Sequence, residues 1–149
     1  MSQELLLFEI DNGTFGVPTS SVREVLRAAA LFPLPEYPAL VEGGLNLRGE
    51  IVPVVDGRIL LARDRKPIDP ADHMIVVRNQ AHCIAIHVDR AISLTVIAQD
   101  DLAEPSSGGK FVKQVVSTEN GPTAIVDVDE LIAACGPAAS RSSSSGMES

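Results

Sequence analysis

Residues 41–58 read VEGGLNLRGEIVPVVDGR, a pattern that predicts a strand, a tight connection and a second strand. Apolar residues flank the tetrapeptide Asn46–Gly49 at a spacing typical of β-strands. Gly49 supplies a backbone position that takes a positive φ angle without steric cost, and the side chain of Asn46 can bond its own nearby backbone. We therefore expect a turn that presents Arg48 at a loop or a strand edge.

Pro53 lies within the second of these predicted strands. Because proline has no amide donor, we expect this strand to be an edge strand or to bulge at Pro53. An edge strand beside an exposed Arg48 is a surface that can receive a partner.

The composition predicts one domain with a core of small and branched side chains. The chain has 149 residues, of which 45% are hydrophobic but only 3% are aromatic. This length is sufficient to bury a core without disulfides or metal, and that core must consist of Val, Ile, Leu and Ala. The net charge of −8 argues against a nucleic-acid partner, because phosphate binding depends on clustered Lys and Arg.

Cys83 and Cys135 lie far apart and belong to no paired motif, which is typical of reduced thiols in a cytoplasmic protein. The N-terminus lacks the features of a secretion signal, and no apolar run approaches the length of a membrane span. We expect a cytoplasmic protein that does not insert into the membrane.

Turn signals divide the rest of the chain into short strands. The predicted pairs are 5–10 with 14–17, 73–78 with 82–88, and 111–116 with 123–128, and a further half-buried strand is predicted at 92–96. Prolines and charges predict loops at 32–38 and 63–72, and polar residues predict a connection at 99–110.

Residues 21–26 fit two structures. Ser21 and Glu24 form a capping box, and Val22, Val25 and Leu26 have helical spacing. In a strand, however, Val22 and Glu24 project from the same face. Periodicity leaves both interpretations open.

The last element is predicted to be a helix, with Asp127 as N-cap, Glu130 at the third helical position, and Val126 facing Leu131 as a hydrophobic staple. Residues 1–135 are therefore expected to form the domain, and the Ser/Ala-rich residues 136–149 to be a disordered tail. Nine or ten short strands with one terminal helix predict a mainly β protein built from small barrels.

Reactive groups are few. His82 is expected to face opposite to Cys83 and His87 along one strand, so these three residues do not converge as metal ligands. No nucleophile elbow, P-loop or dinucleotide fingerprint is present, and we expect neither a metal nor a cofactor. Cys83 and His87 share a strand face, which leaves an enzyme that uses both as an open alternative.

The order of these signals resembles the CheW-like family, the chemotaxis coupling proteins and the related regulatory domain of their histidine kinases. The resemblance rests on LLLFEIDNGTFGVP at 5–18, VREV at 22–25, LNLRGEIVPVVDGR at 45–58 and AIVDVDELI at 124–132. It therefore covers nearly the whole chain before the tail. Gly57 stands where the family commonly has a larger apolar residue.

The resemblance implies two intimately joined five-stranded SH3-like β-barrels that share a core, with a C-terminal helix packed on them. It also implies a noncatalytic adaptor that docks the cytoplasmic tip of a methyl-accepting chemoreceptor to the regulatory domain of a histidine kinase. Such an adaptor is recruited from the cytoplasm to membrane receptor arrays.

By position, Val22, Glu24 and Arg58 correspond to the receptor-binding segment, and Asn46, Leu47, Arg48 and Gly49 to the signature loop at the kinase. We further expect Glu24 and Arg58 to approach each other, because a charge-assisted bond between them would order the binding groove. Arg48 and Arg58 are expected to be isolated positive charges in an acidic surface.

Two further classes of function compete with the flagellar-type adaptor. One is a scaffold of a non-motility chemosensory pathway, such as surface sensing or pilus control. The other is a diverged small-ligand-binding β-barrel, which requires a concave apolar pocket with a few polar groups.

Overall fold

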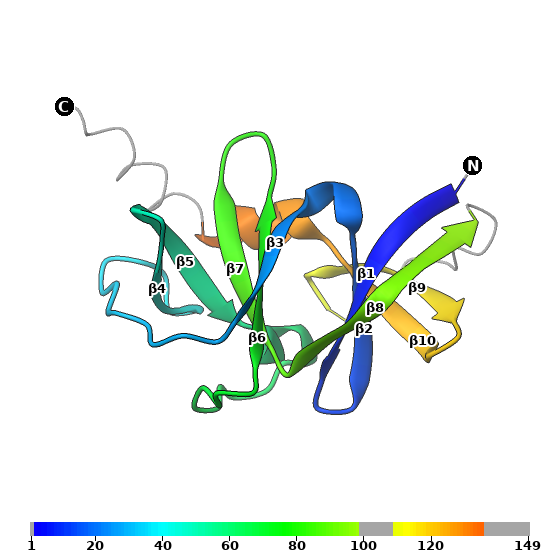
Figure 1. Ribbon diagram of the computed structural model, residues 1–149, viewed down its shortest axis with the longest axis horizontal. Helices are drawn as coiled ribbons and strands as arrows, with labels where there is room; N and C mark the ends of the chain where they lie inside the picture. Colours follow the sequence, from blue (N-terminus) through cyan, green and yellow to red (C-terminus); the bar gives the residue numbers. More distant parts are fainter. Residues whose placement is uncertain (1, 99–108, 136–149) are drawn as a thin grey trace.

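The computed structural model describes residues 2–98 and 109–135, which form ten strands in two five-stranded sheets. Figure 1 shows the two sheets beside each other along the long axis of the molecule. The predicted mainly β architecture of two joined five-stranded units is confirmed.

Each sheet combines antiparallel hairpins with one parallel strand pair. The first sheet has the order β8-β1-β2-β10-β9, and the second has the order β3-β6-β7-β5-β4. The strands of the first sheet are β1 (Ser2–Ile10), β2 (Gly13–Pro18), β8 (Arg90–Ala98), β9 (Val112–Thr118) and β10 (Gly121–Val126). The strands of the second are β3 (Val22–Arg27), β4 (Val41–Leu47), β5 (Glu50–Asp56), β6 (His73–Arg78) and β7 (Cys83–Val88). The parallel pairs are β2 with β10 and β5 with β7.

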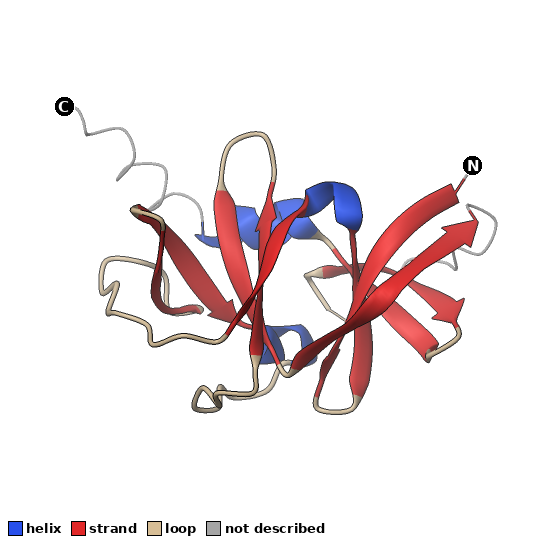
Figure 2. Ribbon diagram, in the orientation of Figure 1, coloured by secondary structure: helices blue, strands red, loops and turns tan. Residues whose placement is uncertain are grey.

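Three helical segments accompany the strands in the described residues (Figure 2). Two are 3-10 helices, η1 (Thr19–Ser21) and η2 (Gly57–Leu61), and the third is the α-helix at residues 128–135. No helix within 2–98 and 109–135 has the length and hydrophobicity to cross a membrane.

Two predicted hairpins have the tight turns that their sequences require. The φ angles are 49° at Asp11 and 70° at Asn12 between β1 and β2, and 52° at Arg48 and 88° at Gly49 between β4 and β5. Two consecutive positive φ angles match the right-handed twist of the flanking strands, as in type I′ turns. The predicted strand, turn and strand across 41–58 are therefore confirmed.

Residues 22–27 form a strand, which settles the open choice between helix and strand. Val22 pairs with Val77, and Glu24 pairs with Val76 after a register shift. Ser21 ends the short helix η1 and does not cap an α-helix. Pairing with β6 is a tertiary interaction, so local spacing alone did not reveal it.

The strand that contains Pro53 was predicted to be an edge strand or to bulge at Pro53. As a whole β5 is an interior strand, between β7 and β4, and the register shift of its pairing with β4 lies opposite Val54 and Val55, next to Pro53 but not at it. The parallel pairing of β5 with β7 spans only Val54 to Asp56, so Pro53 lies just outside it and faces Gly44 of β4. The missing amide donor is therefore tolerated inside the sheet, and β4 is the edge strand.

One hydrophobic core joins the two sheets and the terminal helix. Its buried members include Phe8 and Phe15 from the first sheet, Ile75 from the second and Leu131 from the helix. The two phenylalanine rings stack with centroids 5.8 Å apart. Branched aliphatic side chains supply most of the remainder, as the low aromatic content predicts. The shared core fixes the relative position of the two sheets.

The helix at 128–135 begins as its sequence predicts. The amide of Glu130 donates to Asp127 Oδ1 at 3.1 Å, which satisfies one free donor of the first turn. Val126 and Leu131 are both buried in the shared core. The predicted connection at 99–110, except for its last two residues, and the predicted tail at 136–149 lie outside the described residues.

Candidate functional site

The turn between β4 and β5 has the geometry that its sequence predicts. The amide of Gly49 donates to Asn46 Oδ1 at 2.9 Å, which closes the turn. Arg48 lies at a positive φ angle with a side chain that is 66% exposed. Leu47 instead is buried in the small core of the second sheet, so it supports the turn from beneath.

Ion pairs connect this turn to β3. Arg48 Nη2 donates to Glu24 Oε2, and Arg23 Nη1 donates to Glu50 Oε1 at 2.9 Å. Arg23 also lies 3.8 Å from Glu24. Strands β3 and β4 are the two ends of the sheet order, yet these contacts bring β3 to the β4–β5 hairpin. We call Arg23, Glu24, Arg48 and Glu50 the seam charges.

The predicted approach of Glu24 to Arg58 is wrong, because each has other partners. Glu24 binds Arg48, whereas Arg58 Nη2 donates to Asp11 Oδ1 at 2.6 Å and to Asp89 Oδ1 at 3.0 Å. The side chain of Arg58 is only 6% exposed. Helix η2 turns the chain immediately after β5 and aims Arg58 toward the first sheet. Neither Arg48 nor Arg58 is an isolated charge.

Arg58 is held at the start of η2 by Asp56. The backbone amide of Arg58 donates to Asp56 Oδ1 at 3.0 Å, and Arg58 Nη1 lies 3.7 Å from the same oxygen. Burial lowers the pKa of Arg58, but its hydrogen bonds to Asp11 and Asp89 outweigh this effect and raise it. The hydrogen bond from Arg58 likewise lowers the pKa of Asp11. Arg58 is therefore a permanently charged link between the sheets.

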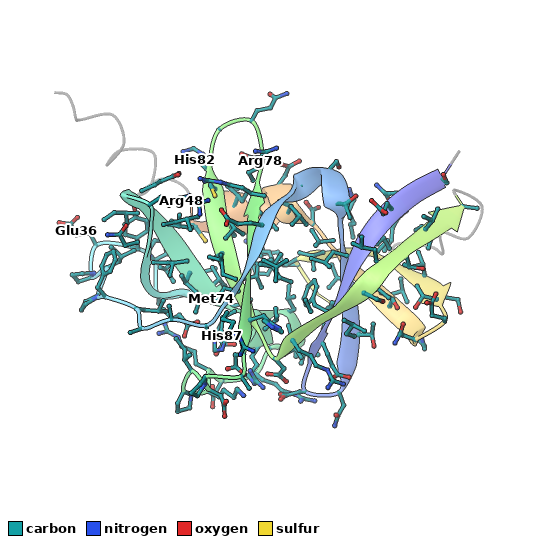
Figure 3. All side chains as sticks on the ribbon, viewed as in Figure 1. Glu36, Arg48, Met74, Arg78, His82 and His87 are labelled. Atoms are coloured by element: carbon teal, nitrogen blue, oxygen red, sulfur yellow. The ribbon has the colours of Figure 1, made fainter. Side chains whose placement is uncertain are left out.

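His87 lies in the same buried region, toward the opposite end of the second sheet from Arg48 (Figure 3). Its Nδ1 lies 3.0 Å from Glu42 Oε2, and its Nε2 lies 2.7 Å from Asp72 Oδ2. Burial lowers the pKa of His87, but the two carboxylates outweigh it and raise the value to about 8. The two carboxylates therefore favour the protonated, positively charged form of the imidazole.

The predicted loop at 63–72 ends in a buried residue, Asp72. Its carboxylate is buried, with Oδ2 at His87 and Oδ1 3.6 Å from Lys66 Nζ. Burial alone would raise the pKa of Asp72. Other interactions outweigh burial and lower the pKa overall, and the hydrogen bond from His87 is the strongest of them. The end of this loop is therefore part of the buried charge cluster.

The pairing of Cys83 with His87 as nucleophile and base is absent. Four residues along a strand correspond to about 13 Å, beyond hydrogen-bond reach. Cys83 Sγ contacts Arg23 Nη1 at 3.6 Å, and burial raises the pKa of this thiol. Both ring nitrogens of His87 contact carboxylates.

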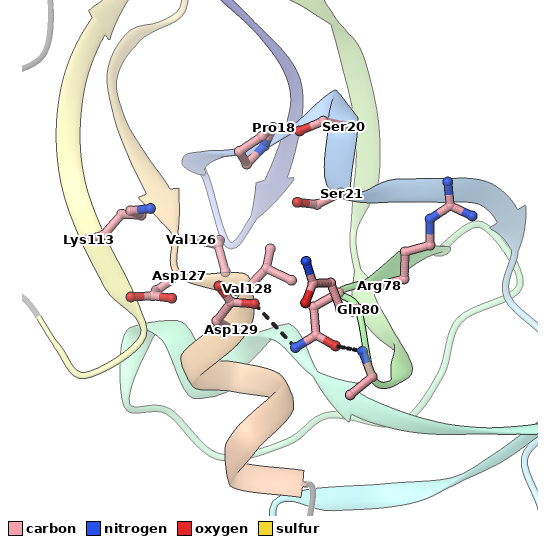
Figure 4. Close-up of a pocket in the computed structure, with 12 residues that line it drawn as sticks. Pro18, Ser20, Ser21, Arg78, Gln80, Lys113, Val126, Asp127, Val128 and Asp129 are labelled. Atoms are coloured by element: carbon pink, nitrogen blue, oxygen red, sulfur yellow. Dashed lines mark hydrogen bonds between the residues drawn. The ribbon is translucent and has the colours of Figure 1, made fainter.

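An open cleft of about 730 Å³ lies between η1, the β6–β7 turn and the start of the terminal helix (Figure 4). Asn79 Nδ2 donates to Asp129 Oδ1 at 3.2 Å across it. Arg78, Lys113 and Asp127 also line it. This polar lining differs from the concave apolar pocket that a small-ligand barrel requires.

Sequence reasoning missed the convergence of Glu42, Asp56 and His87. One ligand-type atom from each of the three lies within 4.8 Å of the others. The residues come from three different strands, and no short motif joins them. The apolar run around His87 was the available signal, because a histidine buried in such a strand requires polar partners.

The fold defines a mainly β domain of two five-stranded sheets with a C-terminal helix. The CheW-like domain model matches residues 4–135, and the chain belongs to this family. It is 33% identical to Protein FrzA of Myxococcus xanthus over 107 residues, covering 72% of this chain and 67% of that protein. It is 29% identical to Chemotaxis protein CheW of Thermotoga maritima over 134 residues, covering 87% of each.

The fold is also found in a solved structure. The crystal structure of the scaffolding protein TtCheW from Thermoanaerobacter tengcongensis superposes with a TM-score of 0.75 at 22% identity, covering 85% of this chain and 89% of that one. The family and these relatives make the chain a chemotaxis-type coupling adaptor. The predicted resemblance is confirmed.

Proposed function

We propose that this chain joins the cytoplasmic tip of a methyl-accepting chemoreceptor to the regulatory domain of a histidine kinase, and that it does so without catalysis. Residues 1–135 are the working domain, and the protein acts in the cytoplasm at membrane receptor arrays. The observation that carries the proposal is the exposed β4–β5 turn, held to β3 by the ion pair between Arg48 and Glu24. This pair joins the two segments that family resemblance assigns to the two partners.

We assign receptor binding to Val22 and Glu24 on β3, and kinase binding to the turn that contains Asn46, Arg48 and Gly49. Leu47 is buried and supports the turn. Arg58 is buried as well, so we replace its predicted receptor contact with a role in holding the two sheets.

Val25 and Ile51 are exposed apolar side chains next to seam charges in the sequence. Because successive side chains of a strand alternate, each projects from the face opposite to the neighbouring charge and can add apolar contact beside it. Binding that buries such side chains depends only modestly on salt, because the neighbouring charges are already paired.

Calorimetry with the kinase regulatory domain and with a receptor tip fragment tests the proposal. The informative variant is Arg48→Asn, because asparagine tolerates the positive φ angle of the turn and removes only the charge. Arg90→Asn is a matched control, since Arg90 is 63% exposed and pairs with Glu9 at 3.0 Å on the other sheet.

We expect one-to-one binding. The affinity of Arg48→Asn should be lower than that of the wild type by about tenfold or more, whereas Arg90→Asn should bind with the affinity of the wild type. Equal affinities for the wild type and Arg48→Asn would remove the turn from the interface. A failure to bind either partner would overturn the coupling proposal itself.

The scaffold of a non-motility pathway and the small-ligand barrel are not favoured. Several relatives are named as chemotaxis proteins, and the cleft of Figure 4 is lined mainly by polar and charged residues.

A further inference from the structure

The charge cluster around His87, which is buried at its centre and open to solvent at Arg63 and Lys66, contains more acids than bases. Among the described residues it includes five carboxylates and three cations, connected by contacts of 2.6 to 3.9 Å. The carboxylates are Asp11, Glu42, Asp56, Asp72 and Asp89, and the cations are Arg58, Arg63 and Lys66. With a neutral imidazole, two negative charges remain uncompensated. A proton on His87 offsets one of them, and a divalent cation offsets both.

The oxygens of the cluster divide into two sets. Asp72 Oδ1 lies toward Lys66, and Asp56 Oδ1 accepts from the amide of Arg58. The other oxygens, Asp72 Oδ2 and Asp56 Oδ2, lie toward His87. Each inner oxygen also accepts one backbone hydrogen bond, Asp56 Oδ2 from the amide of Lys66 at 3.0 Å and Asp72 Oδ2 from the amide of Asp69 at 2.9 Å. Each therefore has one remaining lone pair to direct toward His87.

Three inner atoms converge on one point. His87 Nδ1 lies 3.0 Å from Glu42 Oε2 and 3.9 Å from Asp56 Oδ2, and all three lie within 4.8 Å of one another. Bonds of about 2.0–2.2 Å place the ligand atoms of a metal about 3–4 Å apart. A small movement of the Glu42 side chain brings the three atoms into that range.

Asp72 orients the imidazole for this role. It accepts from Nε2 at 2.7 Å, which fixes the ring and leaves Nδ1 to face Glu42 and Asp56. A histidine bound to a metal usually donates its other ring N–H to a carboxylate in this way. Arg58 Nη1 is a buried donor that has no acceptor among the described residues, and it lies 3.7 Å from Asp56.

We propose that Glu42, Asp56 and His87 form a buried divalent metal site of the zinc class, with Asp72 holding the imidazole from outside. One imidazole with two carboxylates suits zinc better than calcium or magnesium, which prefer oxygen ligands alone. Glu42 retains a small exposed fraction of 8%, which provides the route by which an ion enters. The site lies in the second sheet, away from the seam charges.

Zinc titration of the full, chelator-treated chain tests this proposal. The calorimetric titration is made at about pH 8, because the metal competes with the proton on His87. We expect one saturable zinc equivalent and a rise in the thermal midpoint when zinc is added. Cobalt(II) should give a spectrum of nitrogen and oxygen ligands without a thiolate band.

Variants identify the ligands. His87→Gln and Glu42→Gln should abolish saturable binding, and Asp72→Asn should weaken it by about 10-fold to 100-fold. His82→Gln and Cys83→Ser are controls on other groups that bind zinc, and they should bind as the wild type does.

The absence of saturable binding to the wild type overturns the proposal, whatever the variants do. Binding that survives both His87→Gln and Glu42→Gln, or that is lost in Cys83→Ser, also overturns it, since the ion then sits elsewhere. Circular dichroism checks that each variant is folded. If His87→Gln does not fold, Asp72→Asn and the cobalt spectrum of the wild type decide the question.

Discussion

Gly57 lies where the chain packs too closely to admit a side chain. A Cβ atom at Gly57 would lie 2.5 Å from Ile10 Cδ1 and 2.7 Å from the carbonyl oxygen of His87. Both distances are below those that real Cβ atoms show, and a backbone oxygen cannot move aside cheaply. A larger residue at position 57 would separate η2 from both sheets.

We predict that Gly57→Ala lowers the free energy of unfolding by about 1–3 kcal/mol, through overpacking at this contact. Chemical denaturation measures the change. Gly16→Ala is the matched control, because a Cβ atom there meets its neighbours at 3.4 to 3.5 Å, which is ordinary contact. If both variants lose the same stability, the contact at Gly57 is not the cause.

The carboxylate of Asp11 makes the stability of the protein depend on pH. Hydrogen bonds from Arg58 and then Arg63 hold its pKa below the usual 3.8. The unfolded chain therefore binds the proton more readily than the folded chain. The stability that Asp11 contributes is present above its unfolded pKa and is lost as the pH falls through the folded pKa.

In acid, we predict a shallower loss of stability for Asp11→Asn than for the wild type. The measurement is the denaturation midpoint at a series of pH values below about 4. Above that range the variant should be the less stable of the two, by a constant amount. Parallel curves for the two proteins at low pH would contradict the assigned role of Asp11.

Elements were predictable from the sequence where their signals are local. The turns at Asp11-Asn12 and Arg48-Gly49 depend on φ preferences of single residues, and the helix start depends on Asp127. The strand β3 was left open because its pairing partner β6 lies about 50 residues away in the sequence, beyond any local periodicity.

Within the site, the turn was predictable and its contacts were not. The hydrogen bond from Gly49 to Asn46 spans three residues, whereas Arg58 reaches Asp11 across 47 residues and Asp89 across 31. Which acid an arginine meets at such separations depends on how the sheets pack. For this reason the predicted contact between Glu24 and Arg58 is wrong, although each residue forms an ion pair with another partner.

The side chain of Asp127 stabilises the start of the terminal helix. Asp127→Ala removes the acceptor for the amide of Glu130 and should cost about 1 kcal/mol of stability. Asp127→Asn keeps a capping oxygen, so its stability should remain near that of the wild type. Thermal denaturation compares the three proteins, and equal losses in both variants would point to charge instead of capping.

In the whole molecule, the two sheets are joined by the shared core and by the buried charges around Arg58. Asp11 belongs to the turn of the first sheet, Asp56 ends β5 of the second, and Asp89 lies between β7 and β8, where the chain passes between the sheets. An adaptor that holds two partners requires a fixed relation between its two halves. Arg58 is placed to maintain that relation.

Arg58→Met tests this role because methionine retains part of the apolar stem and removes the charge. In this variant Asp56 stays buried, and Asp11 and Asp89 both lose their main ion-pair partner. We therefore expect a loss of stability on the order of 3 kcal/mol. Arg63→Met is the matched control: Arg63 also binds Asp11, at 3.0 Å, but it is largely exposed. Its loss should stay below about 1 kcal/mol.

Hydrogen exchange adds the test of coupling between the sheets. If Arg58 links them, Arg58→Met lowers the protection of core amides in β1 and β2 as well as in β5 and β7, because both sheets unfold as one cooperative unit. If protection falls only in β5 and β7, the two sheets open separately and Arg58 does not link them. Arg58 then stabilises η2 locally, and its contacts with Asp11 and Asp89 contribute little to the adaptor's rigidity.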